Sequence, residues 1–117
     1  MRPALILSVV ATPALSDPAE VIGVTATLSG GAWRFDVTLT HGDTGWDDYA
    51  DGWRVELADG TVIGDRPLAH PHVNEMPFTR SQSGIVVPEG VSEVHIRTRT
   101  NVEGWGAETV PFPLPPG

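Results

Sequence analysis

Apolar and polar residues alternate along much of this chain. The pattern is clearest in residues 32–41, where one parity is apolar and the other polar. The apolar set is Trp33, Phe35, Val37 and Leu39. A period of two over this length predicts a strand with one buried face. His41 follows on the apolar parity, so we expect it where the inward face ends, at one end of the domain.

The rest of the chain predicts further short strands. They are expected at residues 21–28, 53–57, 61–63, 78–87, 94–99 and 109–114. Asp59-Gly60 predicts a two-residue hairpin turn between the second and third of these. No window has a convincing helical period. About seven strands, spaced by roughly 8–12 residues, predict a single all-β domain, an antiparallel β-sandwich.

The second half carries a resemblance to a known fold. Residues Trp53 to Thr61 (WRVELADGT), Val94 to Gly106 (VHIRTRTNVEGWG) and the final strand resemble the C, C′, F and G strands of fibronectin type III and related immunoglobulin-like domains. The resemblance implies an immunoglobulin-like sandwich. The chain departs from that family where a tyrosine is expected near the start of strand F, because residues 91–94 contain none.

A second resemblance rests on two longer segments. Gly45 to Trp53 reads GW-D-x-Y-AD-x-W, and His70 to Ser81 reads HPHVNE-x-PFTRS. These segments resemble a group of small uncharacterised exported bacterial proteins. The resemblance implies export and brings no particular activity with it.

The first sixteen residues predict a signal peptide. Arg2 provides the positive start, Leu5 to Ala11 the apolar run, and Ala14 to Ser16 a small-x-small cleavage site. The same residues also fit an N-terminal strand. We expect the mature domain, residues 17–117, to be periplasmic or secreted. The apolar run is too short for a bilayer-spanning helix, so we expect no membrane span in the mature chain.

Composition narrows the classes of partner. The chain has no cysteine, which excludes disulfides and thiolate metal sites. Its basic residues are seven arginines against fifteen acidic residues, and the net charge is -8. Nucleic acids and anionic membranes attract positively charged proteins. We therefore expect an envelope protein or a small ligand as partner, and no nucleic acid.

The segment around Pro71 predicts a metal site. His70 and His72 are two residues apart, so in an extended backbone both imidazoles face the same side. Glu75 can supply an oxygen and His41 a third imidazole. Neutral imidazole suits copper or zinc. In the alternative interpretation, the two histidines flank Pro71 in a crossover and hydrogen-bond to the backbone. A cupin-like site fits less well, because the spacing after His72 departs from the cupin pattern.

The segment from Gly42 to Gly52 interrupts the strands and predicts a ligand-binding loop. It holds four aspartates beside Trp46 and Tyr49, and Trp53 follows directly. These three aromatic residues can stack on a sugar or hold a cationic group. Alternatively, Trp46 or Tyr49 folds back as a lid on the sandwich. The aspartates can also hold Ca²⁺, although the EF-hand spacing is absent.

These observations predict a non-catalytic, exported binding or accessory module of the cell envelope, without a resident cofactor. The alternative is a periplasmic protein that binds copper or zinc through its HPH segment. The two predictions share one geometric condition. A site of either kind requires the HPH segment to cross the same end of the sandwich as His41 and the Trp/Asp-rich loop.

Overall fold

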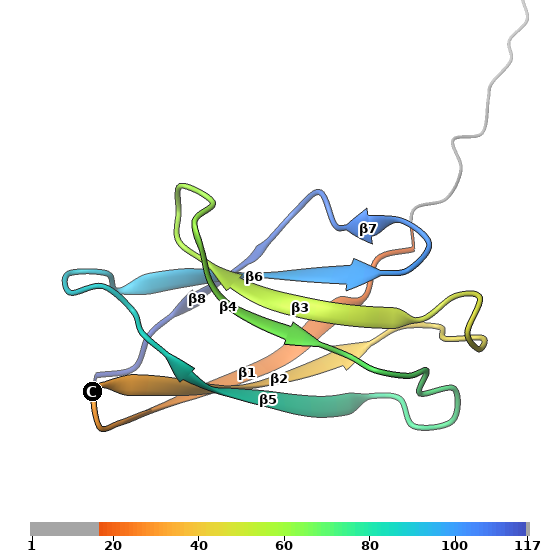
Figure 1. Ribbon diagram of the computed structural model, residues 1–117, viewed down its shortest axis with the longest axis horizontal. Coiled ribbons are helices and arrows are strands. Elements are labelled where there is room, and N and C mark those ends of the chain that lie inside the picture. Colours follow the sequence, from red (N-terminus) through yellow and green to blue (C-terminus); the bar gives the residue numbers. More distant parts are fainter. Residues whose placement is uncertain (1–16, 117) are drawn as a thin grey trace, which may run out of the picture.

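A computed structural model of the protein describes residues 17–116, and the expected signal peptide lies outside this range. Eight strands form two antiparallel sheets that pack face to face (Figure 1). The strands are β1 (Glu20–Ser29), β2 (Ala32–Thr40), β3 (Ala50–Glu56), β4 (Val62–Pro67), β5 (Phe78–Ile85), β6 (Glu93–Thr100), β7 (Gly104–Trp105) and β8 (Val110–Pro113). The all-β sandwich prediction is confirmed. Residues 17–116 contain no helix of the length and apolarity needed to cross a membrane.

The strand order leaves two free edges side by side. The first sheet has the order β1-β2-β5, and the second has the order β4-β3-β6. Both β7 and β8 pair with β6, one after the other along its outer side. Among the described residues, β1 therefore has a strand partner only in β2, and β8 only in β6. No strand pairing of the described residues bridges the seam between these two edges.

The core lies between the sheets and follows the predicted alternation. Phe35 and Val37 of β2 are completely buried, and they face Trp53, Val55 and Val94 of the second sheet, which are equally buried. Alternate residues of β2 point inward because successive side chains of a strand lie on opposite faces. Trp53 is fully buried, so it belongs to the core and is not part of the ligand-binding surface predicted for the preceding loop.

One end of the sandwich collects the segments that carry most of the candidate chemistry. The β2–β3 loop (residues 41–49), the β4–β5 crossover (68–77), the β6–β7 turn (101–103) and the entering chain (17–19) meet there, on the right of Figure 1. We call this region the loop end. The crossover connects the second sheet to the first. The HPH segment thus crosses the same end as His41 and the Trp/Asp-rich loop.

The β3–β4 turn differs from the prediction. The Leu57 amide donates to the Thr61 carbonyl (2.8 Å), so three residues, and not two, form the loop. A two-residue type I′ turn requires positive φ at both central positions. Here Gly60 has φ +90° and Asp59 does not have a positive φ. Asp59 instead accepts a side-chain hydrogen bond from the Thr61 amide (2.9 Å). The following strand is also longer than predicted, because pairing with β3 continues to Pro67.

Candidate functional sites

Asp43 holds the loop end together. Its carboxylate is completely buried, and one oxygen accepts from the Ala50 amide at 3.0 Å while lying 2.6 Å from His41 Nδ1. The other oxygen accepts from the backbone amide of His72 at 2.9 Å. Asp43 therefore ties the β2–β3 loop to the β4–β5 crossover. A buried carboxylate needs such donors, because an unpaired buried charge is strongly unfavourable.

His41 is buried at the end of β2, as its parity predicts. Its Nδ1 donates to Asp43, and its Nε2 donates to the backbone carbonyl of Asp17 at 2.9 Å. Carboxylate oxygens of Asp17 and Asp48 lie 3.3 and 3.8 Å from the same Nε2. Burial lowers the pKa of His41, but the Asp43 hydrogen bond and the Asp17 charge outweigh it, so the pKa is raised overall. Both ring nitrogens of His41 thus face oxygen acceptors, which favours the protonated imidazole.

His72 has the opposite electrostatic environment. Its ring stacks on Phe78, with centroids 4.0 Å apart, and its Nε2 accepts from Arg80 at 2.8 Å. Arginine has only donors, so the ring proton of neutral His72 lies on Nδ1, which is buried without a hydrogen-bond partner. Burial lowers the pKa of His72, and the charges of Arg80 and His70 lower it further. His72 is therefore neutral, and its Nε2 lone pair is already engaged.

The predicted partners of His72 lie at the surface beside it. The ring of His70 is exposed, with its centroid 4.8 Å from that of His72. A Glu75 oxygen lies 3.9 Å from His72 Nε2 and equally far from Arg80. The structure thus gathers His70, His72 and Glu75, with Arg80 among them. His41 belongs to a different cluster, which faces Asp17 and Asp48.

The aromatic loop presents one ring to solvent. Trp46 is 65% exposed and meets Tyr49 edge to face, with centroids 5.6 Å apart. Asn101 fixes this loop to the end of β6: its amide nitrogen donates to the Trp46 carbonyl, and its amide oxygen accepts from the Tyr49 amide. Trp46 and Tyr49 thus form a surface that ligands can reach. Trp53 does not take part, because it lies in the core.

The four aspartates of this loop diverge. Asp43 points into the interior, Asp48 points toward His41, and Asp51 pairs with Arg99. Asp47 is exposed. Their oxygens are thus directed to different partners, which does not favour one Ca²⁺ site made by all four.

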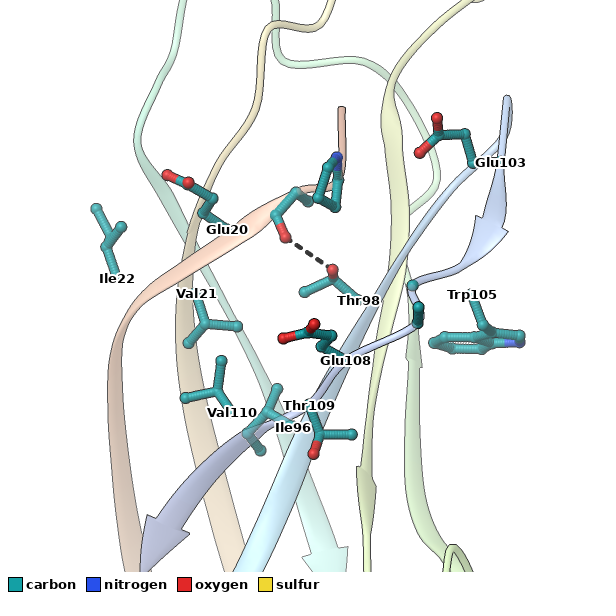
Figure 2. Close-up of a pocket in the computed structure, with 14 residues that line it drawn as sticks. Glu20, Val21, Ile22, Ile96, Thr98, Glu103, Trp105, Glu108, Thr109 and Val110 are labelled. Atoms are coloured by element: carbon teal, nitrogen blue, oxygen red, sulfur yellow. Dashed lines mark hydrogen bonds between the residues drawn. The ribbon is translucent and has the colours of Figure 1, made fainter. Parts of the chain in front are cut away.

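A large open groove lies at the seam between the free edges of β1 and β8. Its volume is about 1010 Å³, and Figure 2 shows the residues that line it. Val21, Ile96 and Val110 cluster in it, and Glu108 points toward its middle. Its other lining residues include Glu20, Ile22, Thr98, Glu103 and Trp105. We call this cavity the seam groove.

The seam groove forms where the chain leaves the sheet between β7 and β8. Gly106 still bonds to the Thr98 carbonyl, and pairing with β6 resumes only at Val110. Thr98 in turn donates to the Ala19 carbonyl at 2.8 Å and holds the start of β1 across the seam. Val110 lies within the strand predicted for residues 109–114 and is 40% exposed, because no strand covers it. The sequence contains no separate motif for this groove.

Comparison with known proteins gives one informative relative. No protein family model matches the chain, and no solved structure matches it significantly. The chain is 44% identical over 93 residues to a protein of Halomicrobium mukohataei described as a "Putative lipoprotein". The matched segment is 79% of this chain and 45% of that relative, so the chain spans less than half of the relative's length.

Proposed function

We propose that this protein is an exported, envelope-associated binding module that takes an extended peptide segment into the seam groove. The observation that carries the proposal is the apolar floor with carboxylates around it, set between two free strand edges. The relative's description as a lipoprotein supports the envelope location. The lining of the groove defines the chemistry of the peptide.

The free edge of β1 favours an extended ligand. An edge strand offers unpaired backbone donors and acceptors, to which a peptide can add as a further strand. Side chains of an extended peptide alternate between two faces. One face of the ligand then contacts Val21 and Val110 on the groove floor.

The charge of the groove selects basic ligands. Glu20 and Glu108 are exposed carboxylates on opposite walls, from β1 and from the segment that precedes β8. Arginine or lysine side chains can pair with them while apolar neighbours fill the floor. The net charge of -8 also accelerates encounter with a cationic peptide. The preferred ligand is thus a segment that alternates apolar and basic residues.

A matched pair of synthetic peptides tests this function. A dye-labelled ten-residue peptide that alternates Val and Arg is titrated against the full chain, beside the same peptide with Glu in place of Arg. Fluorescence anisotropy gives the affinity, and amide NMR shifts locate the site. We expect the basic peptide to bind, with shifts at Val21, Trp105 and Val110, and the acidic peptide not to bind.

Two charge-matched variants separate the groove from general electrostatics. Glu108→Gln removes a groove carboxylate, and Glu89→Gln removes an exposed one in the β5–β6 loop. We expect Glu108→Gln to weaken binding about two- to fivefold, since an exposed ion pair contributes up to about 1 kcal/mol. Equal weakening by both variants, or shifts outside the groove, would contradict the proposed function.

A further inference from the structure

We propose that Asp17, His41 and Asp48 form a site for a divalent transition metal ion, with zinc as the reference ion. Each residue offers one ligand atom, and the three atoms lie within 4.8 Å of one another. This is the one group of three or more His, Asp and Glu residues within 17–116 that meets this spacing. The site lies at the loop end, next to the start of the seam groove, whose lining begins at Pro18.

The spacing of the ligand atoms suits a zinc ion. Zinc binds nitrogen and carboxylate oxygen at about 2.0–2.2 Å, so two ligand atoms in tetrahedral positions lie about 3.3–3.6 Å apart. The Asp17 and Asp48 oxygens lie 3.3 and 3.8 Å from His41 Nε2. Two edges of the tetrahedron are therefore nearly in place, and small side-chain rotations of the two aspartates complete it. A water molecule can take the fourth position.

Asp43 prepares His41 for this role. Its buried oxygen holds the Nδ1 proton at 2.6 Å and fixes the direction in which Nε2 points. Metal-bound histidines commonly donate their other ring N–H to a carboxylate, which fixes the tautomer and makes the ligand nitrogen more basic. Without metal, Nε2 donates its proton to the Asp17 carbonyl. A bound ion takes the place of that proton, which leaves to solvent.

The donor set selects the class of ion. One imidazole with two carboxylates suits zinc and other divalent transition metals better than Ca²⁺ or Mg²⁺, which prefer oxygen alone. The ion also offsets the negative charge that Asp17, Asp43 and Asp48 concentrate around one ring. His72 is a weaker candidate, since its Nε2 accepts from the Arg80 guanidinium.

Titration of the full chain with Zn²⁺ tests the site. Isothermal calorimetry should show one ion per chain at micromolar Zn²⁺ and no binding of Mg²⁺ at the same concentration. Histidine ring NMR should show a shift of the His41 resonances. Asp48→Asn should weaken binding at least tenfold, because it removes a ligand charge, while its thermal unfolding remains cooperative.

Two control variants make the test specific. Asp47→Asn changes the charge by the same amount at the neighbouring exposed position and should leave Zn²⁺ affinity within threefold of the original. His70→Ala removes the exposed histidine of the HPH segment and should also leave the affinity unchanged. No stoichiometric binding, an equal effect of Asp47→Asn, or loss of binding with His70→Ala would overturn the proposal. None of these outcomes bears on the seam groove.

Discussion

Glu56 is predicted to be a main electrostatic support of the second sheet, and Glu56→Gln tests this. The residue points to the outer face of β3 but is only 1% exposed. Arg97 donates to both of its oxygens, at 2.7 and 3.1 Å, and Arg54 donates to one at 2.7 Å. Arg54 also lies over the ring of Trp105, 4.0 Å from its centroid. The side chains of Arg54 and Arg97 thus shield the Glu56 carboxylate from solvent.

The size of the effect follows from these contacts. Hydrogen bonds to charged groups contribute about 1.5–3 kcal/mol each, and breaking a buried ion pair costs about 3–5 kcal/mol. Gln retains one acceptor and nearly the same shape, but it loses the charge. Both arginines are partly exposed, and Arg97 keeps its bond to the Gly106 carbonyl, so water offsets part of the loss. We expect Glu56→Gln to lower the free energy of unfolding by about 2–4 kcal/mol.

Urea unfolding at pH 7, followed by circular dichroism, measures this change. Glu89→Gln is the matched control, because it alters the same charge at an exposed loop position, and we expect a change within about 0.5 kcal/mol. The reasoning is refuted if Glu56→Gln costs less than about 1 kcal/mol or no more than the control. Such a result would mean that burial of the carboxylate cancels its ion pairs.

The pH dependence of the same difference gives a second, independent prediction. The Arg97 hydrogen bonds lower the pKa of Glu56, burial opposes them, and Arg54 adds to the lowering, so the folded pKa lies below the unfolded one. The contribution is therefore complete above the unfolded pKa of about 4.3 and is lost as pH falls through the folded pKa. The stability difference between the original chain and Glu56→Gln should stay constant from pH 8 to 6 and shrink below roughly pH 4. A difference that grows on acidification would contradict the sign of the shift.

Two further substitutions test the packing of the sandwich and of the aromatic loop. Gly64→Ala places a methyl group 2.6 Å from the Ile85 side chain and should cost about 1–3 kcal/mol in urea unfolding, whereas Gly42→Ala meets nothing within 4 Å and should change little. Equal costs would mean that the sheets adjust freely at Gly64. Trp46→Ala should change stability by less than about 1 kcal/mol, because the ring is mostly exposed; a loss above about 2 kcal/mol would indicate that Trp46 closes the sandwich with Tyr49 as a lid.

The parts of the fold that depend on local periodicity could be predicted from the sequence. The alternation in β2 identifies the buried face and places His41 at its end. The same alternation applies to Trp53, which shares the inward parity of Val55, and the structure follows it. The burial of Trp53 removes it from the ligand-binding surface predicted for the loop. The HPH segment, with Pro71 at its centre, lies in a crossover between the two sheets, as its alternative interpretation predicts.

The contacts that shape the candidate sites could not be predicted in this way. Asp43 accepts a hydrogen bond from the backbone amide of His72 because the β2–β3 loop and the β4–β5 crossover meet at one end of the sandwich. Arg80 of β5 donates to the ring of the same histidine. Glu56 lies on the same outward parity of β3 as Arg54, so the alternation predicts an exposed side chain. In the structure, Arg97 of the neighbouring strand β6 donates to its carboxylate and covers it. The seam groove depends on where β8 resumes pairing with β6. Such features depend on strand order and register, which short-range patterns do not specify.

The position of Asp43 links the two histidine clusters that the sequence suggested as one site. Its oxygens divide between the ring of His41 and the backbone of His72, so the two clusters share a carboxylate and no common ligand position. An ion on His41 would draw electron density from the ring and strengthen its bond to Asp43. The other oxygen of Asp43 would then become a weaker acceptor for the crossover amide. Metal binding at the proposed site should therefore weaken the hydrogen bond of the His72 backbone amide to Asp43. The His72 ring should keep its hydrogen bond with Arg80.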